Sequence, residues 1–263
     1  MYSMKKIAAL ILDWAGTTID YGCFAPVDAF IAAFEAFGIT PAIDETRAPM
    51  GLPKRTHIEK MLECPQIAAQ WQSLHGRSPA REDVNAIYAR FEPALFEALA
   101  AHTDPLPGAV EAAAYIRDMG LHIGSTTGYT RAMMDVVVPL AKSKGYTPDC
   151  VVCPDDTGGT GRPYPYMLWR NLEKLGVSSI GEVLKAGDTA ADMQEGKNSG
   201  CLCVGILKGS SMLGLSENEL AHKTNAETAA LFETARQKYM EAGADYVIED
   251  LSSLPGLIKS LNH

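Results

Sequence analysis

The sequence predicts an α/β fold, a doubly wound parallel sheet with a helical cap domain inserted after the first strand. From residue 120 onward, short apolar runs alternate with amphipathic stretches, which is the pattern of parallel strands joined by crossover helices. Between the first apolar run and residue 103, apolar side chains recur at helical spacing and no strand pattern is evident. The 263 residues are enough for a sheet domain with a smaller domain inserted into it.

The first apolar run, residues 7–12, predicts a short buried strand. Because Lys5 and Lys6 precede it, the start of the chain resembles a signal peptide in charge. The run stops at Asp13, however, and no small-residue cleavage site follows. We therefore expect a cytoplasmic protein.

The predicted domains are an α/β core formed by residues 1–20 and 104–263 and a helical cap formed by residues 21–103. A serine followed by proline, Ser78-Pro79, predicts the start of a cap helix, with proline at its first position. The side chains at helical spacing in the cap are Val27, Phe30, Ile31, Phe34 and Phe37, then Val84, Ile87, Tyr88, Phe91, Leu95 and Leu99.

The second part of the core is expected to alternate regularly between strands and helices. Thr224 and Glu227 have the spacing of a capping box before its last long helix, and Gly243 is placed to end that helix. The expected strands are 121–125, 150–153, 183–186, 201–207 and 246–248, and the expected helices are 131–142, 164–175, 190–198, 226–242 and a final stretch at 251–261.

Composition excludes several classes of function. Lys and Arg total 23 against 32 Asp and Glu, a formal charge of −9 without a basic block, so we expect no nucleic-acid partner. No span reaches the roughly 20 apolar residues of a membrane helix, so no membrane partner is expected either. Cys150 and Cys153 form a C-x-x-C pair inside a β-like run, where we expect structural thiols, with a redox or zinc role as the alternative.

The residues that carry chemistry are the first polar ones after each apolar run, because ligands bind beyond the carboxyl ends of parallel strands. Carboxylates suit Mg²⁺, hydroxyl groups and a guanidinium suit phosphoryl oxygens, and one carboxylate can attack phosphorus. These segments are Asp13-Trp14-Ala15-Gly16-Thr17-Thr18, Ser125-Thr126-Thr127-Gly128, Gly161-Arg162-Pro163 and Gly187-Asp188-Thr189-Ala190-Ala191-Asp192.

These four segments, in this order, resemble the motifs of the haloacid-dehalogenase superfamily. The resemblance implies that Asp13 is the nucleophile that forms an aspartyl-phosphate, and that Asp13 and Asp188 bind Mg²⁺ as the cofactor. It also implies that the phosphoryl group is held by Thr126 or Thr127, Gly128 and Arg162, the last standing where most members carry lysine.

Ala15 departs from the pattern of phosphatases in this superfamily, which carry a general-acid aspartate at that position. An alanine side chain cannot protonate an alkoxide, so only the backbone carbonyl of Ala15 remains useful, as a metal ligand. The leaving group should therefore be one that needs no acid. Lys54 suggests which: it is either a solvated surface lysine or a desolvated amine that forms an imine with a carbonyl substrate.

An imine on Lys54 would let a carbon–phosphorus bond break without an alkoxide, and the sequence resembles the branch of the superfamily that cleaves such bonds. The resemblance implies hydrolysis of a small-molecule phosphonate, phosphonoacetaldehyde, to acetaldehyde and phosphate, by a homodimer formed through the insert. The segments that carry it are residues 13–26, Met50-Gly51-Leu52-Pro53-Lys54, Gly124-Ser125-Thr126-Thr127-Gly128-Tyr129-Thr130 and Gly161-Arg162-Pro163-Tyr164-Pro165.

Five further residues have a functional and a structural interpretation. His57 is a proton relay or a solvent-facing helix residue, and Tyr129 lines the substrate pocket or only packs. Asp192 reaches the metal through water or stabilises a helix N-terminus. Cys23 and Met50 should line the cavity under the insert. Two other functions stay open: a phosphatase or mutase of the same superfamily, and a non-catalytic phosphate-binding or redox protein.

Overall fold

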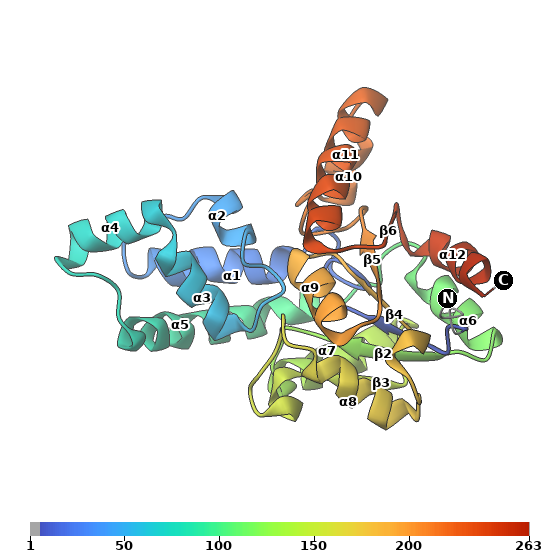
Figure 1. Ribbon diagram of the computed structural model, residues 1–263. Coiled ribbons are helices and arrows are strands. Elements are labelled where there is room, and N and C mark those ends of the chain that lie inside the picture. The colour runs from blue at the N-terminus through green and yellow to red at the C-terminus, as the bar shows by residue number, and fades with distance from the viewer. Residues whose placement is uncertain (1–5, 263) are drawn as a thin grey trace.

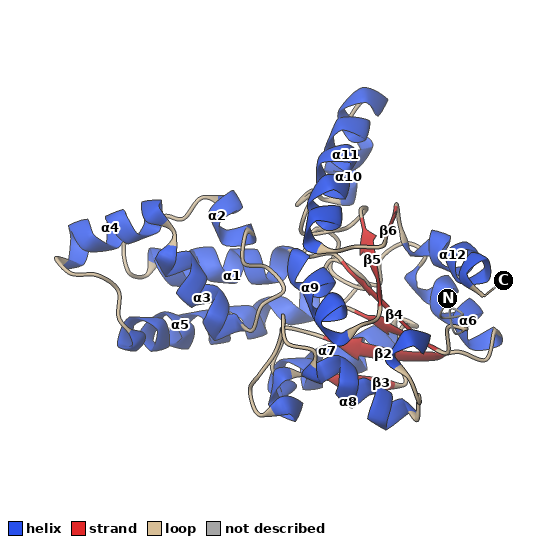
Figure 2. Cartoon of the chain, in the orientation of Figure 1, coloured by secondary structure: helices blue, strands red, loops and turns tan. Residues whose placement is uncertain are grey.

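The computed structural model describes residues 6–262, so the part of the signal-peptide interpretation and of the core boundary that falls on residues 1–5 and 263 lies outside it. A six-stranded sheet forms the core, and all its neighbouring strands are parallel, in the order β3-β2-β1-β4-β5-β6. Its strands are β1 (Ala9–Leu12), β2 (His122–Thr126), β3 (Cys150–Val152), β4 (Val183–Gly187), β5 (Leu202–Ile206) and β6 (Tyr246–Ile248). The predicted doubly wound sheet is confirmed (Figure 2).

Alternate residues of the central strands point to opposite faces of the sheet, and each face is covered by helices. Leu10 and Leu12 of β1 pack on the face of α6 and α12, while Ala9 and Ile11 pack against α8 on the other face. The core helices are α6 (Ala109–Asp118), α7 (Arg131–Ser143), α8 (Tyr166–Leu175), α9 (Ala190–Ser199), α10 (Glu217–Ala221), α11 (Asn225–Ala242) and α12 (Leu254–Leu261). Of these, α6 and the short α10 were not among the expected elements.

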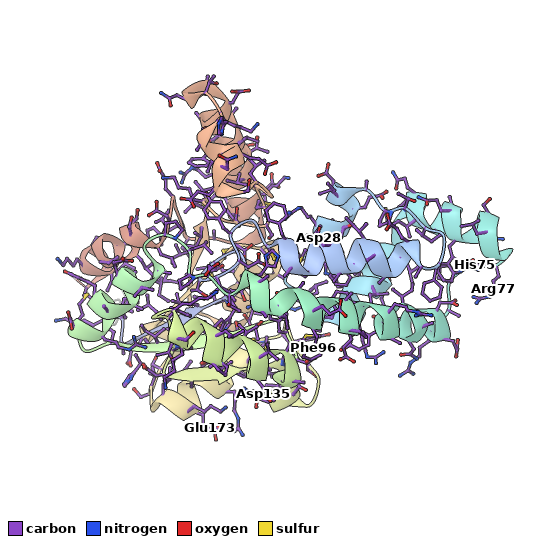
Figure 3. The ribbon with its side chains drawn as sticks, turned by 180° about the vertical axis from the view of Figure 1, so that it is seen from behind. Asp28, His75, Arg77, Phe96, Asp135 and Glu173 are labelled. Carbon is purple, nitrogen blue, oxygen red and sulfur yellow. The ribbon has the colours of Figure 1, made fainter. Side chains whose placement is uncertain are left out.

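Five helices of the predicted cap lie beside the sheet, joined to it by the segments before α1 and after α5 (Figure 1). They are α1 (Phe24–Glu35), α2 (Ile43–Arg47), α3 (Lys54–Glu63), α4 (Pro65–His75) and α5 (Arg81–Leu99). Seen from behind, α1 and α5 run side by side, and α5 ends near α7 at Phe96 (Figure 3). The side chains at helical spacing are buried between these helices, except Ile31 and Phe37, which are partly buried.

The predicted start of α5 at Ser78-Pro79 is wrong. The helix begins at Arg81, and the carboxylate of Asp83 accepts the backbone N–H of Ala80 at 2.7 Å. Asp83 also forms a bidentate ion pair with Arg77, at 2.6 and 2.7 Å. A carboxylate satisfies the free N–H groups of a helix start as well as a serine does, so the later position is stabilised instead.

The predicted ends of α11 are confirmed. Thr224 Oγ1 accepts the N–H of Glu227 at 3.3 Å, and the Glu227 carboxylate accepts the N–H of Thr224 at 2.8 Å. Gly243 follows the helix with φ 105°, a conformation that glycine adopts without a Cβ clash.

The cysteines are free thiols, as expected for a structural role. Cys150 lies in β3 with its Sγ 2.9 Å from Asn171 Oδ1, and Cys153 follows the strand in the buried core. Burial raises the pKa of both thiols, that of Cys153 to about 12, whereas reactive C-x-x-C pairs have lowered values. Over residues 6–262, no helix is long and apolar enough to cross a bilayer.

Candidate active site

Asp13 follows β1 at the carboxyl edge of the sheet, between the ends of β2 and β4. Its backbone N–H donates to Ala186 O of β4 at 3.0 Å, and the Thr18 hydroxyl donates to its carbonyl oxygen at 2.9 Å. These bonds fix the backbone, while the carboxylate is only 5% exposed and accepts a bond from Arg162 Nη2 at 2.7 Å. Asp13 is thus a positioned and buried carboxylate, as a nucleophile requires.

Asp13, Asp188 and Asp192 form a buried acidic cluster, with one carboxylate oxygen of each within 4.8 Å of the others. Asp188 accepts bonds from Ser211 N at 2.8 Å, Ser211 Oγ at 2.6 Å and Thr17 Oγ1 at 3.1 Å. All three donors are neutral. Burial and the charges of Asp13 and Asp192 raise the pKa of Asp188 to about 8. A hard divalent cation would relieve this repulsion, so these residues fit Mg²⁺.

The backbone after β1 comes close to this cluster. A Cβ on Gly16 would lie 2.4 Å from Asp188 Oδ2, and its φ of 84° is in the left-handed region. Only glycine lets the chain pass Asp188 here. Ala15, the neighbouring residue, lines the same cavity as Asp13, and its carbonyl stays a predicted metal ligand.

Arg162 is held by three acidic residues. Its Nη2 lies 2.7 Å from Asp13 Oδ1 and 3.0 Å from Asp192 Oδ1, and its Nε donates to Glu195 Oε2 at 3.1 Å. A buried arginine fixed by several bonds loses little further freedom on binding a phosphoryl group. The geometry keeps the guanidinium beside the nucleophile.

Two buried charged residues behind Arg162 were not predicted from the sequence, Glu195 and Lys185. Lys185 Nζ lies 2.7 Å from Asp192 Oδ1 and donates to Thr126 Oγ1 at 2.9 Å. Burial alone would raise the pKa of Asp192, but the two nearby cations hold it below the usual value. A lysine inside the apolar run of β4 was the available signal, because buried lysines are almost always paired.

The two threonines of the second motif have different surroundings. Thr126 Oγ1 donates to Glu195 Oε2 at 3.0 Å and accepts bonds from Arg162 and Lys185, so it belongs to the support of Arg162. Thr127 lines the cavity with Asp13, and its oxygen accepts the N–H of Tyr129 at 3.0 Å. The hydroxyl hydrogen of Thr127 is therefore free to donate toward the cavity.

Lys54 begins α3 and is only 6% exposed, so the surface interpretation of this lysine is wrong. Its Nζ lies 4.8 Å from the ring centroid of Tyr129 and 5.8 Å from that of Phe30. Burial, helped by the charge of Arg162, lowers the pKa of Lys54 to about 8. A substantial fraction of the amine is thus neutral near pH 8, which imine formation needs.

Lys54 from the cap and Asp13 from the core line one small cavity, of about 20 Å³. Such a volume holds about one water molecule, so the cavity in this arrangement has no room for a substrate. The lining residues are Asp13, Ala15, Cys23, Pro26, Met50, Gly51, Lys54, Thr127, Gly128, Tyr129, Arg162 and Thr189. Cys23, Met50 and Tyr129 are thus brought together around this cavity.

Glycines allow the cap loop to touch the core. A Cβ on Gly51 would lie 2.4 Å from Thr189 Oγ1, one on Gly128 would lie 2.8 Å from Leu52 O, and one on Gly161 would lie 2.7 Å from Pro53 Cγ. Larger residues at these positions would hold the two parts away from each other.

His57 is fully buried, so its solvent-facing interpretation is wrong. Its ring stacks on Phe30 with centroids 3.8 Å apart, and Nε2 donates to Thr46 O at 2.9 Å. Nδ1 has no hydrogen-bond partner in the described part of the chain. Burial and the charge of Lys54 lower the pKa of His57 well below its usual value, so the ring is neutral and Nδ1 keeps a free lone pair.

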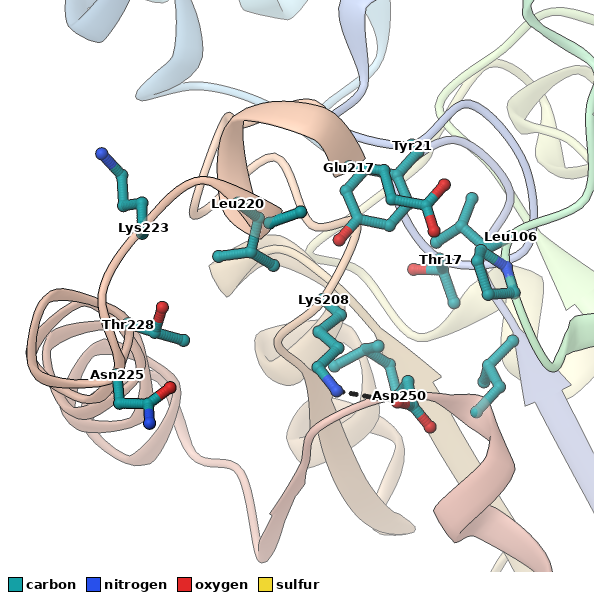
Figure 4. Close-up of a pocket in the computed structure, with 14 residues that line it drawn as sticks. Thr17, Tyr21, Leu106, Lys208, Glu217, Leu220, Lys223, Asn225, Thr228 and Asp250 are labelled. Atoms are coloured by element: carbon teal, nitrogen blue, oxygen red, sulfur yellow. Dashed lines mark hydrogen bonds and ion pairs between the residues drawn. The ribbon is translucent and has the colours of Figure 1, made fainter.

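A second cavity, of about 440 Å³, lies on the core between the β1 loop and α10 (Figure 4). One of its lining residues, Thr17, bonds Asp188 of the site. Of its two lysines, Lys208 is paired with Glu249 and Asp250, at 3.0 and 3.3 Å. A lysine neutralised in this way gives the cavity no clear ligand preference.

One family model matches the part of the chain that carries most of these residues. The model of haloacid dehalogenase-like hydrolases matches residues 7–200. This chain belongs to that family. It is accordingly a hydrolase with an α/β core.

Relatives of this hydrolase point to one activity within the family. A phosphonoacetaldehyde hydrolase of Lysinibacillus sphaericus is 45% identical over 98% of this chain and 96% of its own length. A bifunctional phosphonoacetaldehyde hydrolase/aminoethylphosphonate transaminase of Clostridioides difficile is 46% identical over 97% of this chain, which spans only 40% of that relative. The crystal structure of a phosphonoacetaldehyde hydrolase-like protein of Oleispira antarctica matches with TM-score 0.96 and 34% identity, covering 100% of this chain and 95% of that one.

Proposed function

We propose that this hydrolase cleaves the carbon–phosphorus bond of phosphonoacetaldehyde to give acetaldehyde and phosphate. The observation that carries the proposal is the shared cavity of Asp13 and Lys54, with Ala15 in place of a general acid. A carboxylate and a buried amine together suit a substrate that has a phosphonate at one end and an aldehyde at the other. The names of the relatives support the same substrate.

The reaction begins when the Lys54 amine condenses with the aldehyde and releases water, leaving an imine. Asp13 attacks phosphorus, and the electrons of the breaking carbon–phosphorus bond move into an enamine on Lys54. The enamine takes a proton on carbon and returns to an imine, which water hydrolyses to acetaldehyde. A second water hydrolyses the acyl phosphate on Asp13, which releases phosphate and restores the carboxylate.

The remaining cavity residues bind and orient the phosphonate. Arg162 and the hydroxyl of Thr127 would donate to phosphonate oxygens, with Gly128 leaving room for the backbone to approach. Mg²⁺, bound by Asp13, Asp188 and the Ala15 carbonyl, would neutralise charge between carboxylate and phosphonate when present. Asp192 supports Arg162 and borders this metal site.

His57 is the proposed proton relay for Lys54. Its ring is neutral, its Nδ1 has no hydrogen-bond partner among the described residues, and the charge of Lys54 acts on its pKa. Cys23 and Met50 would form the apolar wall around the two-carbon unit. We further propose a cytoplasmic homodimer formed through the cap, as the family resemblance implies.

The deciding experiment is release of phosphate and acetaldehyde from phosphonoacetaldehyde with Mg²⁺, compared with release of phosphate from phosphate monoesters. Asp13→Asn should lose at least about 10³-fold in turnover, because an amide does not attack phosphorus. Asp135→Asn, an exposed change of the same kind on α7, serves as the control (Figure 3). Hydrolysis of monoesters alone would make the protein a phosphatase, and a fully active Asp13→Asn variant would remove Asp13 from the mechanism.

A further inference from the structure

Arg47 is the last residue of cap helix α2. Its guanidinium contacts both the core and the first linker, the segment before α1 that joins core and cap. Nη1 donates to Gly22 O in the first linker at 2.7 Å and lies 3.4 Å from Ser211 O in the loop after β5. Gly22 in turn donates its N–H to Gly209 O of that loop at 2.7 Å. One cation of the cap therefore contacts both the linker and the core.

The residues around the Arg47 side chain suit a planar guanidinium group. A Cβ on Gly214 would lie 2.8 Å from Arg47 Nε and 2.9 Å from Cζ, so the core backbone lies flat against the group. Cζ also lies 5.1 Å from the ring centroid of Phe24, within cation–π range. A planar guanidinium fits between a ring and a glycine, whereas an ammonium group would not.

Arg47 and Ser211, the two residues of this contact between cap and core, are each hydrogen-bonded to a residue of the candidate active site. Met50 donates its N–H to Arg47 O at 3.0 Å, so Arg47 begins the turn that places Met50 and Gly51 in the catalytic cavity. On the core side, Ser211 holds Asp188 through its N–H and its hydroxyl.

An open cleft of about 710 Å³ lies outside the same contact, between α2 and the core. Met50 and Thr189 line both this cleft and the small cavity, so they form the wall between them. Arg47 borders the cleft as well. Movement of α2 away from the Ser211 loop would join the cleft to the cavity.

We propose that Arg47 is a positioning residue: its contacts with Gly22 and Ser211 hold the cap against the core and so keep Lys54 in the same cavity as Asp13. These contacts break when the cap opens toward the cleft and form again when it closes. This inference goes beyond the proposed function, because it depends on contacts of the closed protein and not on which substrate is cleaved.

Cys23 provides a measure of opening that needs no substrate. Its thiol is buried in the small cavity and becomes accessible when the cap leaves the core. The rate of alkylation of Cys23, followed by peptide mass mapping, then reports the open population when opening is fast relative to labelling. Arg47→Ala should increase this rate about tenfold or more, because a bond from a charged donor is lost.

Cys153 is the internal control, since it is fully buried in the sheet domain and lines neither the cavity nor the cleft. Arg55→Ala is the matched variant: Arg55 is an exposed arginine of α3 that bonds Asn85 within the cap. It should leave the Cys23 rate unchanged. Arg47→Lys should fall between the parent and Arg47→Ala, because lysine keeps the charge but not the planar fork.

Three results would overturn the proposal. Unchanged Cys23 labelling in Arg47→Ala would show that Arg47 does not hold the cap. Equal acceleration at Cys23 and Cys153 would show general destabilisation instead of cap opening. Equal acceleration at Cys23 in Arg55→Ala would show that any loss of a cap arginine has this effect.

Discussion

The amine of Lys54 is buried beside aromatic rings. This environment lowers its pKa and so sets the pH range in which the neutral amine can react. Because its pKa is lowered to about 8, the neutral fraction rises steeply between pH 7 and 9 and levels off above that range. Imine formation with an aldehyde should follow the same curve. The pH dependence of trapping therefore tests the chemistry of the residue separately from turnover.

Incubation with acetaldehyde and then borohydride should inactivate the protein and add one two-carbon group at Lys54. The trapped fraction at short times should increase from pH 7 to 9, because only the neutral amine attacks the carbonyl. Peptide mass mapping locates the adduct. Lys54→Arg should be inactive and resist the treatment, since a guanidinium stays charged. A main adduct on another lysine, or an active Lys54→Arg variant, contradicts the imine step.

At the scale of elements, the start of α9 joins helix stability to the site. Thr189 Oγ1 accepts the N–H of Asp192 at 3.1 Å, and the Asp192 carboxylate accepts bonds from Thr189 N and Oγ1, at 3.2 and 2.5 Å. The same carboxylate contacts Arg162. The capping box at the start of α9 therefore also orients the Asp192 carboxylate, which lies behind the candidate phosphoryl site.

Thr189→Ala should lower the free energy of unfolding by about 1 kcal/mol, the usual effect of losing such a cap, and should also reduce phosphate release. Thr224→Ala removes an equivalent capping box from the exposed start of α11. It should lower stability without changing phosphate release. Urea unfolding and turnover measured on both variants separate the two effects. Equal activity of the two variants would show that the α9 cap has no influence on the site.

On the scale of the whole molecule, the two linkers between cap and core are tied together by His102 and Asp20. His102 Nδ1 lies 2.9 Å from Asp20 Oδ1, and Asp20 also accepts the N–H groups of Phe24 and Ala25 at the start of α1. The hydrogen bond to Asp20, with the charges of nearby carboxylates, raises the pKa of His102 above 6.5. The linkers are thus held by a protonated histidine at mildly acidic pH.

Since the folded-state pKa of His102 is raised, its stabilisation is fully present below about pH 6.5 and is lost as pH rises through the raised value. The difference in Tm between the parent and His102→Asn should therefore be largest near pH 5.5 and shrink toward pH 8. His222→Asn, at an exposed histidine of the core, is the comparison. A Tm difference that does not change with pH would rule out the charged pair.

Several features of the fold follow from the sequence because they depend on local patterns. The alternation of apolar runs and amphipathic stretches predicted β2 to β6 and the expected helices between and after them within three residues, since buried parallel strands are short and apolar. α6 was missed because no expectation was formed for residues 104–120. The start of α5 was misplaced because the carboxylate of Asp83, held by Arg77, caps the helix instead of Ser78.

For the site, the sequence by itself predicted Asp13, Asp188 and Arg162, because strand ends in one parallel sheet meet at one edge, and Lys54 through the resemblance of its segment to a known family. Only the tertiary structure decided which threonine faces the cavity, and that His57 is buried. It alone also revealed Glu195 and Lys185 behind Arg162, and Arg47 on the Ser211 loop. These contacts join residues far apart in the chain, and their geometry depends on how helices, sheet and cap pack together, which no local pattern of residues specifies.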